Sequence, residues 1–371
     1  MANCHVFFVP SIQCIDNIAF IPSSVLSKLL LLKKSTAVNP DSFPPIVLHS
    51  CAYQLSIPLS IIYNVVFTRS ELPSLWLASN VIPLYKKKGQ RNLVSNYRPI
   101  SISSSCCKVM ESIIKDFILK FLVSNHLITD HQHGFLKGRS TVTNLLNSIR
   151  HWLSSLNSGK SSDIIYVDFA KAFDSVSHSK LLQKLRSYGI RGKLLNWISA
   201  WLSGRTQSVK IQNISSAAKP VLSGVLQGSV LGPLLFLIFI NDLVDDLDPS
   251  ANPTLFADDL KLFSDANVIP TSSDSHSVFC PLLQNSLNKL HLWCLKWQLQ
   301  ISISKCAVLS ISNSRSPKPR RYSINSHPIP EVTSYSDLGV IVDNQLTFSI
   351  HVLSAAKGPQ AICPYNPLFS L

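Results

Sequence analysis

The sequence lacks several features that would place it in other classes of protein. Its nine cysteines include no C-x-x-C spacing, which argues against a zinc site or a disulfide framework. No window approaches the ~20 apolar residues of a membrane span, and the N-terminus lacks the basic region and apolar core of a secretory signal. We therefore predict an intracellular protein with reduced, mostly buried thiols and no membrane partner.

Charge is also scarce, and what there is has one dominant sign. Only 15% of the 371 residues are charged while 46% are hydrophobic, so the chain is globular and could hold two or three subdomains. Lys and Arg number 34 against 20 Asp and Glu, a net charge of +14. That excess favours a polyanion partner along a basic groove, although many basic proteins bind no nucleic acid.

Two adjacent carboxylates stand out against this basic background. In Phe256-Ala257-Asp258-Asp259 they lie between apolar segments, which predicts two short strands joined by a tight acidic turn. Adjacent acids repel, so the pair suggests that a divalent cation occupies the turn. A solvated turn is the alternative, because Asp is common in turns.

A second strand also ends on a carboxylate. The segment 163–167 is rich in strand formers and closes on Asp168. Carboxylates at the ends of two buried strands can meet across a sheet and hold two metal ions, the arrangement used for in-line attack on a phosphate.

These segments carry a resemblance to a known family. The stretches 167–178, 223–233 and 256–259 resemble the first three palm motifs of a reverse transcriptase, in the family's order and with its spacing. The resemblance is to non-LTR retrotransposons of the LINE type, jockey-like, and extends from about Pro40 to about His351. It implies an α+β, right-hand polymerase fold with fingers, a palm with an antiparallel sheet, and a thumb that is truncated or only begun. The implied regions are an N-terminal extension at 1–72, fingers at 73–160, a palm at 161–312, and a linker with the start of the thumb side at 313–371.

The resemblance also implies roles for individual residues. The catalytic group is Asp168, Asp258, Asp259 and Lys305, and the metal ligands are Asp168, Phe169, Asp258 and Asp259. Residues at the nucleotide are Lys86, Lys87, Arg98, Phe173 and Gln227, and residues at the template are Lys137, Arg139 and Gly228. The implied cofactors are two Mg²⁺ ions, with Mn²⁺ as a substitute.

Several of these roles have a simpler alternative. The lysines at 86 and 87 belong to a basic turn that could be merely solvated, and so could Lys305, the candidate general acid for departing pyrophosphate. Lys137 could belong to a plain glycine-containing turn. Phe173, whose ring in the family lies beneath the incoming sugar, could be simply core.

The function implied is that of an RNA-directed DNA polymerase in nucleus and cytoplasm, using an RNA template, a DNA primer and dNTPs. The alternative is an inactive, truncated remnant that only binds nucleic acid. Ser42, Leu77 and Leu226 depart from the family pattern and favour that alternative. Ser42 replaces a glycine and would strain its turn if the position takes a positive φ.

Helical patterns complete the prediction. Apolar spacing predicts a helix over 108–123 and one buried face from Leu283 to Trp297. The stretch 47–68 is predicted to form one or two helices broken at Pro58.

Overall fold

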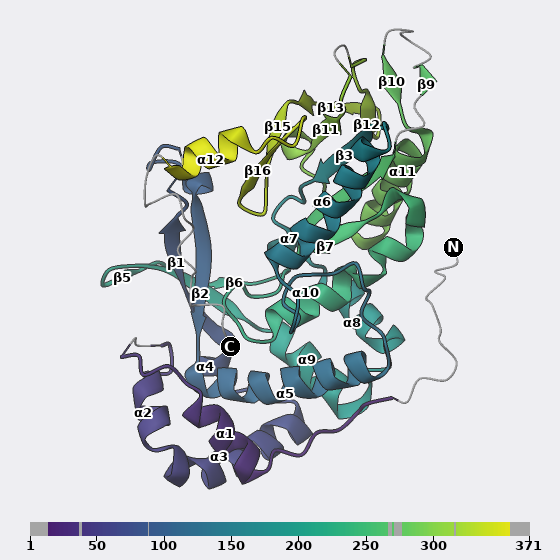
Figure 1. Cartoon of the computed structure of the whole chain (residues 1–371). Coiled ribbons are helices and arrows are strands. Elements are labelled where there is room, and N and C mark those ends of the chain that lie inside the picture. Colours follow the sequence, from purple (N-terminus) through teal and green to yellow (C-terminus); the bar gives the residue numbers. More distant parts are fainter. Residues whose placement is uncertain are drawn as a thin grey trace. The chain divides into compact units, whose positions relative to one another are not determined.

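The computed structural model describes residues 14–36, 39–87, 89–265, 269–270, 277–314 and 317–356. The chain divides into two compact units of mixed helices and sheets, and Figure 1 labels their helices and strands. Unit 1 comprises Met1–Ile128 and Lys171–Ile240, and unit 2 comprises Thr129–Ala170 and Asn241–Leu371. The end of the last predicted region, 357–371, lies outside the described residues.

Unit 1 is rich in helices. They are α1 (Pro22–Leu30), α2 (Pro45–Ser50), α3 (Ala52–Arg69), α4 (Ser74–Leu77), α5 (Ser105–Ser124), α7 (Ala172–Ser175), α8 (His178–Ser187), α9 (Gly192–Leu202) and α10 (Gly232–Ile240), with the 3₁₀ turn η1 (Val94–Asn96). Helix α1 contacts α3 and α5, and α8 contacts α9 and α10. The rings of Phe20 and Trp76 each pack edge-on against Tyr63 in the core.

The sheet of unit 1 has the order β2-β1-β4-β5, and β6 also pairs with β4. Its strands are β1 (Ala78–Tyr85), β2 (Tyr97–Ser103), β4 (Thr206–Ile211), β5 (Ile214–Ser215) and β6 (Lys219–Pro220). β1 and β2 form an antiparallel hairpin, whereas β1 and β4 are parallel. The loop that carries Lys86 and Lys87 connects the two strands of this hairpin.

Unit 2 is built on a five-stranded sheet of order β14-β11-β3-β8-β7. Its helices are α6 (Thr141–Asn157), α11 (Pro281–Trp297) and α12 (Ser349–Ala356), with 3₁₀ turns η2 (Asn241–Asp246), η3 (Pro249–Ala251) and η4 (Ile303–Lys305). The sheet strands are β3 (Ser162–Val167), β7 (Thr254–Phe256), β8 (Asp259–Asp265), β11 (Ala307–Ile311) and β14 (Glu331–Val332). Six shorter strands form three separate two-stranded sheets. These pair β9 (Ile269–Pro270) with β10 (Val278–Phe279), β12 (Tyr322–Ile324) with β13 (His327–Ile329), and β15 (Ser334–Asp337) with β16 (Val340–Asp343).

The pairing within this sheet is antiparallel except between β11 and β14. Helix α6 contacts β3 and β7 and places Trp152 in the core, where its ring packs edge-on against Phe263 of β8. Every residue of β3 is buried, as expected for a strand with neighbours on both sides. The central strands β3 and β8 therefore form a rigid support for the residues at their ends.

Local sequence explains where several helices begin. Ser104 caps α5 by accepting a hydrogen bond from the Cys107 N–H, and Ser140 and Thr143 cap α6 reciprocally. The predicted helix over 108–123 is present as α5, and the predicted buried face from Leu283 to Trp297 is present in α11.

Two local predictions have clear outcomes. Ser42 adopts a φ of 59°, so a serine occupies the left-handed region that glycine favours. The predicted break at Pro58 is wrong, because α3 continues through it and the chain breaks at Cys51 instead. Pro58 and Gln54, whose carbonyl loses its helical donor, are both exposed, so water can satisfy that carbonyl.

Candidate active site

The predicted acidic hairpin is present in unit 2. Phe256 of β7 pairs with Asp259 of β8, which leaves Ala257 and Asp258 as the two residues of the turn. Ala257 is buried and has a φ of +56°, a left-handed conformation that costs a non-glycine residue about 1–2 kcal/mol. The turn therefore depends on its surroundings to keep this shape.

The surroundings that touch the turn come from the segment before α6. The Gln132 Oε1 atom accepts hydrogen bonds from the Ala257 N–H at 2.9 Å and the Gly134 N–H at 2.7 Å. A Cβ atom on Gly134 would lie 2.4 Å from the Ala257 nitrogen, so the backbone leaves no room for a side chain there. The turn is thus packed against backbone and bonded by one buried side chain.

Strand β3 brings Asp168 to the same edge of the sheet. The last antiparallel pair of β3 and β8 is Val167 with Leu260, so Asp168 and Asp259 come next on their two strands. The Asp168 backbone oxygen accepts a hydrogen bond from the Ser302 N–H at 2.8 Å, which fixes the chain just after β3. The register therefore gathers three carboxylates, those of Asp168, Asp258 and Asp259, at one edge.

Lys305 lies against this group. Its Nζ is 3.2 Å from the Asp168 Oδ1, and the two side chains are 64% and 33% exposed. An exposed ion pair contributes little to stability. The contact is informative because it places an ammonium group beside the carboxylates.

Burial, and after it mutual repulsion, raises the pKa of two of these carboxyl groups. Burial and the nearby Asp168 raise the pKa of Asp258. Burial, with Asp258 and Asp168, raises the pKa of Asp259 to about 7. The Asp259 residue is exposed, however, so solvent screens part of this effect. A cation bound nearby would stabilise the ionised form of such a carboxyl group.

The oxygen atoms available at this edge are of the kind that bind hard divalent cations. Carboxylate oxygens and backbone carbonyls are the ligands that Mg²⁺ takes, and Phe169 supplies a carbonyl next to Asp168. Within the described ranges, no three His, Cys, Asp or Glu side chains are already arranged around a point where an ion could sit.

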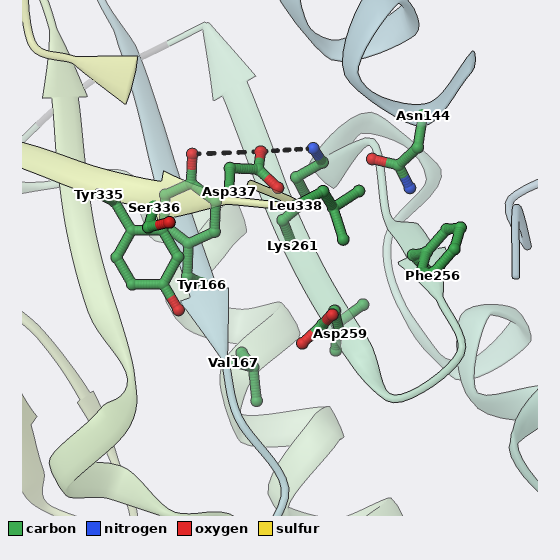
Figure 2. Close-up of a pocket in the computed structure, with 11 residues that line it drawn as sticks. Asn144, Tyr166, Val167, Phe256, Asp259, Lys261, Tyr335, Ser336, Asp337 and Leu338 are labelled. Carbon is green, nitrogen blue, oxygen red and sulfur yellow. Dashed lines mark hydrogen bonds and ion pairs between the residues drawn. The ribbon is translucent and has the colours of Figure 1, made fainter. Parts of the chain in front are cut away.

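A small pocket of about 60 Å³ lies beside Asp259 (Figure 2). Asp337 of β15 lines it and accepts hydrogen bonds from Lys261 at 2.6 Å and from the Tyr166 hydroxyl at 3.5 Å. Tyr335 stacks on Tyr166 with ring centroids 3.9 Å apart. These contacts attach the β15–β16 hairpin to the strands that carry the acidic edge.

Unit 1 holds the predicted cations of the nucleotide group. Lys86, Lys87 and Arg98 are all exposed, the first two in the β1–β2 loop and Arg98 on β2 opposite Leu84. The Lys86 Nζ donates to the Ser95 carbonyl at 2.8 Å across the loop. The loop thus presents its positive charge to solvent.

Phe173 and Gln227 lie on two segments of unit 1 that pair with each other. The Val225 N–H donates to the Phe173 carbonyl at 2.8 Å, and the Phe173 ring stacks on Phe236 of α10 at 4.3 Å. Gln227 accepts from the Ser101 N–H at 2.8 Å, and a Cβ on Gly228 would lie 2.4 Å from the Ser101 oxygen. Both Phe173 and Gln227 are half-buried, so each keeps an exposed part.

Two other residues predicted at the template, Lys137 and Arg139, differ in the contacts of their side chains. Lys137 is exposed in the turn before α6. The Arg139 guanidinium instead donates to the Asp130 carboxylate at 2.6 Å and to the Gln132 carbonyl at 3.2 Å. Arg139 therefore already has partners within its own loop.

Sequence reasoning missed two buried polar residues that support these elements. The sequence analysis singled out neither Gln132 nor Glu111. Fully buried Glu111 accepts from the N–H groups of Val230 and Leu231 just before α10, and from the Trp201 indole at 3.1 Å. An available signal was its position on the apolar face of α5, where a charged residue needs partners.

None of the helices within the described residues is both long and apolar enough to cross a membrane.

Known proteins resemble most of this chain. Residues 85–342 match the family described as reverse transcriptase (RNA-dependent DNA polymerase). The probable RNA-directed DNA polymerase from transposon BS of Drosophila melanogaster is 27% identical over 89% of this chain and 36% of its own length. The RNA-directed DNA polymerase from mobile element jockey of the same fly is 28% identical over 79% and 32%. A retrovirus-related Pol polyprotein from a type-1 R2 element of Popillia japonica is 30% identical over 59% and 32%.

The chain thus spans about a third of the length of these relatives. The family match covers well over half of the chain and includes both the acidic edge and the paired segments of unit 1. This chain belongs to the reverse transcriptase family, and its relatives are polymerases of non-LTR retrotransposons.

Proposed function

We propose that this chain is an RNA-directed DNA polymerase that extends the 3′-hydroxyl of a DNA primer on an RNA template with dNTPs. The observation that carries the proposal is the placement of Asp168, Asp258 and Asp259 at one edge of the β3–β8 pair. Family membership supports it independently. The inactive remnant is not favoured, since the acidic edge and its lysine are intact.

Asp168 and Asp258 would hold two divalent ions, Mg²⁺ or Mn²⁺, with the Phe169 carbonyl as a further ligand and Asp259 nearby. When bound, such ions stabilise negative charge on the attacking and leaving oxygens of an in-line displacement. A bond forms between the primer 3′-oxygen and the α-phosphorus as the bond to pyrophosphate breaks. The hydroxyl proton would pass to solvent water, and Lys305 would donate a proton to the departing pyrophosphate.

The other predicted residues act on binding. Exposed Lys86, Lys87 and Arg98 would hold the triphosphate, because cations near the transferred group stabilise its charge. Phe173 would exclude a ribose 2′-hydroxyl, and Gln227 would contact the nucleotide. Lys137, Arg139 and Gly228 would contact the template, with Arg139 exchanging its present partners for phosphate.

The regional organisation follows the family. Fingers would cover 73–160, a palm 161–312, and the region from 313 would begin the thumb side, after an extension at 1–72. The RNA template and dNTPs would place the reaction inside the cell, in nucleus and cytoplasm.

Primer extension tests the proposal. The purified chain is incubated with dTTP, Mg²⁺ and oligo-dT annealed to poly-rA, and parallel reactions contain EDTA or no template. We expect dT addition that needs both template and Mg²⁺. Binding of the primed template without any extension, in Mg²⁺ or Mn²⁺, would show that the chain binds nucleic acid but does not polymerise.

A further inference from the structure

The acidic turn is held by a side chain that the reaction itself does not use. Ala257 stands in a left-handed conformation, and the two residues after it carry carboxylates that repel each other. Alanine itself does not favour this shape, since it has neither the freedom of glycine nor a side chain that can form hydrogen bonds. Its shape must come from neighbouring atoms.

Gln132 supplies those atoms through both ends of its amide. Its Oε1 accepts from the Ala257 N–H at 2.9 Å, and its Nε2 donates to the Ala257 carbonyl at 3.4 Å. The orientation of the amide is determined, because the Ala257 and Gly134 N–H groups both need an acceptor at the same place. One side chain therefore holds the peptide groups on both sides of the strained residue.

Gln132 is itself fixed in position. It is 2% exposed, and its backbone forms a parallel bridge with Leu255 of β7. The His133 N–H donates to the Leu255 carbonyl at 2.8 Å, and the Leu255 N–H donates to the His131 carbonyl at 2.9 Å. The segment 131–133 thus runs along β7 and presents the amide directly to the turn.

We propose that Gln132 is a positioning residue that keeps Ala257 left-handed and thereby orients Asp258 and Asp259 toward the metal ions. This inference rests on the proposed function of the acidic edge. It assigns to Gln132 no contact with substrate. Residues that orient metal ligands typically affect metal affinity by 10–100-fold, so the effect is measurable without any polymerisation.

The test measures Mn²⁺ affinity of the whole chain, without nucleic acid, from the electron paramagnetic resonance signal of free Mn²⁺. Gln132→Asn keeps an amide but is one methylene too short, and we expect at least tenfold weaker binding. Gln132→Glu, protonated in this buried place, keeps the accepting oxygen and an O–H donor, so its affinity should stay within about threefold of wild type. Adding Ala257→Gly to Gln132→Asn should restore affinity to within about threefold, because glycine adopts the left-handed conformation unaided.

Asn144→Leu is the matched control, since the buried Asn144 amide bonds the Leu255 carbonyl of β7 at 3.1 Å and no atom of the turn. Its Mn²⁺ affinity should equal that of wild type. Wild-type affinity in folded Gln132→Asn, or an equal loss in Asn144→Leu, would overturn the proposal and leave the proposed function standing. If Gln132→Asn does not fold alone, the double variant Gln132→Asn/Ala257→Gly decides: a folded protein with affinity within threefold of wild type supports the proposal, and a tenfold loss refutes it. Unchanged Mn²⁺ binding in Asp258→Asn would show that the metal site is wrongly assigned, and it would contradict this inference as well.

Discussion

Two hairpins of this molecule carry opposite charges and are built in opposite ways. The β7–β8 turn is two residues long, and its Ala257 is buried and bonded by Gln132. The β1–β2 loop is longer, its Lys86 and Lys87 are exposed, and the Lys86 ammonium donates to the Ser95 carbonyl of the same loop. One hairpin holds its charges in fixed places, and the other presents them to solvent.

The difference indicates what each hairpin can contribute. Ligands of a metal ion must lie in defined places, which a short buried turn provides at the expense of strain. Cations that hold a triphosphate act over several ångströms and benefit from a loop that can adjust. Substitutions in the acidic turn should therefore abolish nearly all activity, whereas substitutions in the basic loop should lower activity by smaller steps.

The largest expected effect is at the acidic edge. Asp168→Asn should lower primer extension by about 10³-fold or more while leaving folding nearly intact, because it removes charge that the metal ions need. Asp265→Asn, at the opposite end of β8, is the matched control and should stay within about twofold. Rates are measured on primed poly-rA, and equal losses in both variants would show that the sheet, not the site, is affected. Asp259→Asn should be milder than Asp168→Asn.

The second effect concerns the sugar of the nucleotide. Phe173→Val should raise incorporation of GTP relative to dGTP by about 10–100-fold, the scale of a steric change worth ~1–3 kcal/mol. Single-nucleotide extension on a matched template measures this ratio. Phe236→Leu removes the stacked neighbour but keeps the Phe173 ring, so its ratio should stay within about threefold. An unchanged ratio in active Phe173→Val would identify the ring as simply core.

The basic loop should give a graded response. Lys86→Ala and Lys87→Ala should each raise the KM for dTTP by about three- to tenfold and change kcat less, since each removes one of several cations. The exposed Lys219 of β6, in the same unit, serves as the control through Lys219→Ala. A 10³-fold loss at either loop lysine would contradict the contrast between the two hairpins.

The smallest effect is on stability and follows from the pKa of Asp259, which is raised to about 7. Because the folded chain binds this proton more tightly than the unfolded chain, stability falls as pH rises from about 4 to 7. Asp259→Asn removes that loss, so without divalent ions its Tm at pH 8 should exceed that of wild type by about 1–3 °C. The gain should vanish at pH 4, and a gain of equal size at both pH values would have another cause.

Short-range pattern was enough to predict the parts that carry charge. The apolar segments on both sides of Asp258 and Asp259 and the strand formers before Asp168 predicted β7, β8 and β3, and the structure confirms these strands. Apolar spacing likewise predicted α5 and the buried face of α11. These features depend on neighbours a few residues apart, which the sequence displays directly.

What could not be predicted depends on contacts between distant residues. Gln132 meets Ala257 across 125 positions, and Glu111 meets Val230 across 119. Either side chain would be ordinary at an exposed position, and only the fold makes it a buried acceptor of backbone N–H groups. Pro58 was misjudged for a related reason, since its cost to α3 depends on whether water reaches the carbonyl that it leaves without a donor.

The most direct test of the central claim compares wild type with Asp258→Asn in single-turnover extension of a DNA primer, oligo-dT, annealed to a poly-rA template. Both proteins are first shown to be folded by circular dichroism and to bind primed poly-rA equally. The account predicts Mg²⁺-dependent dT addition by wild type and a loss of about 10³-fold or more in Asp258→Asn. Extension by folded Asp258→Asn at the wild-type rate would contradict the assignment of the acidic turn as the catalytic site.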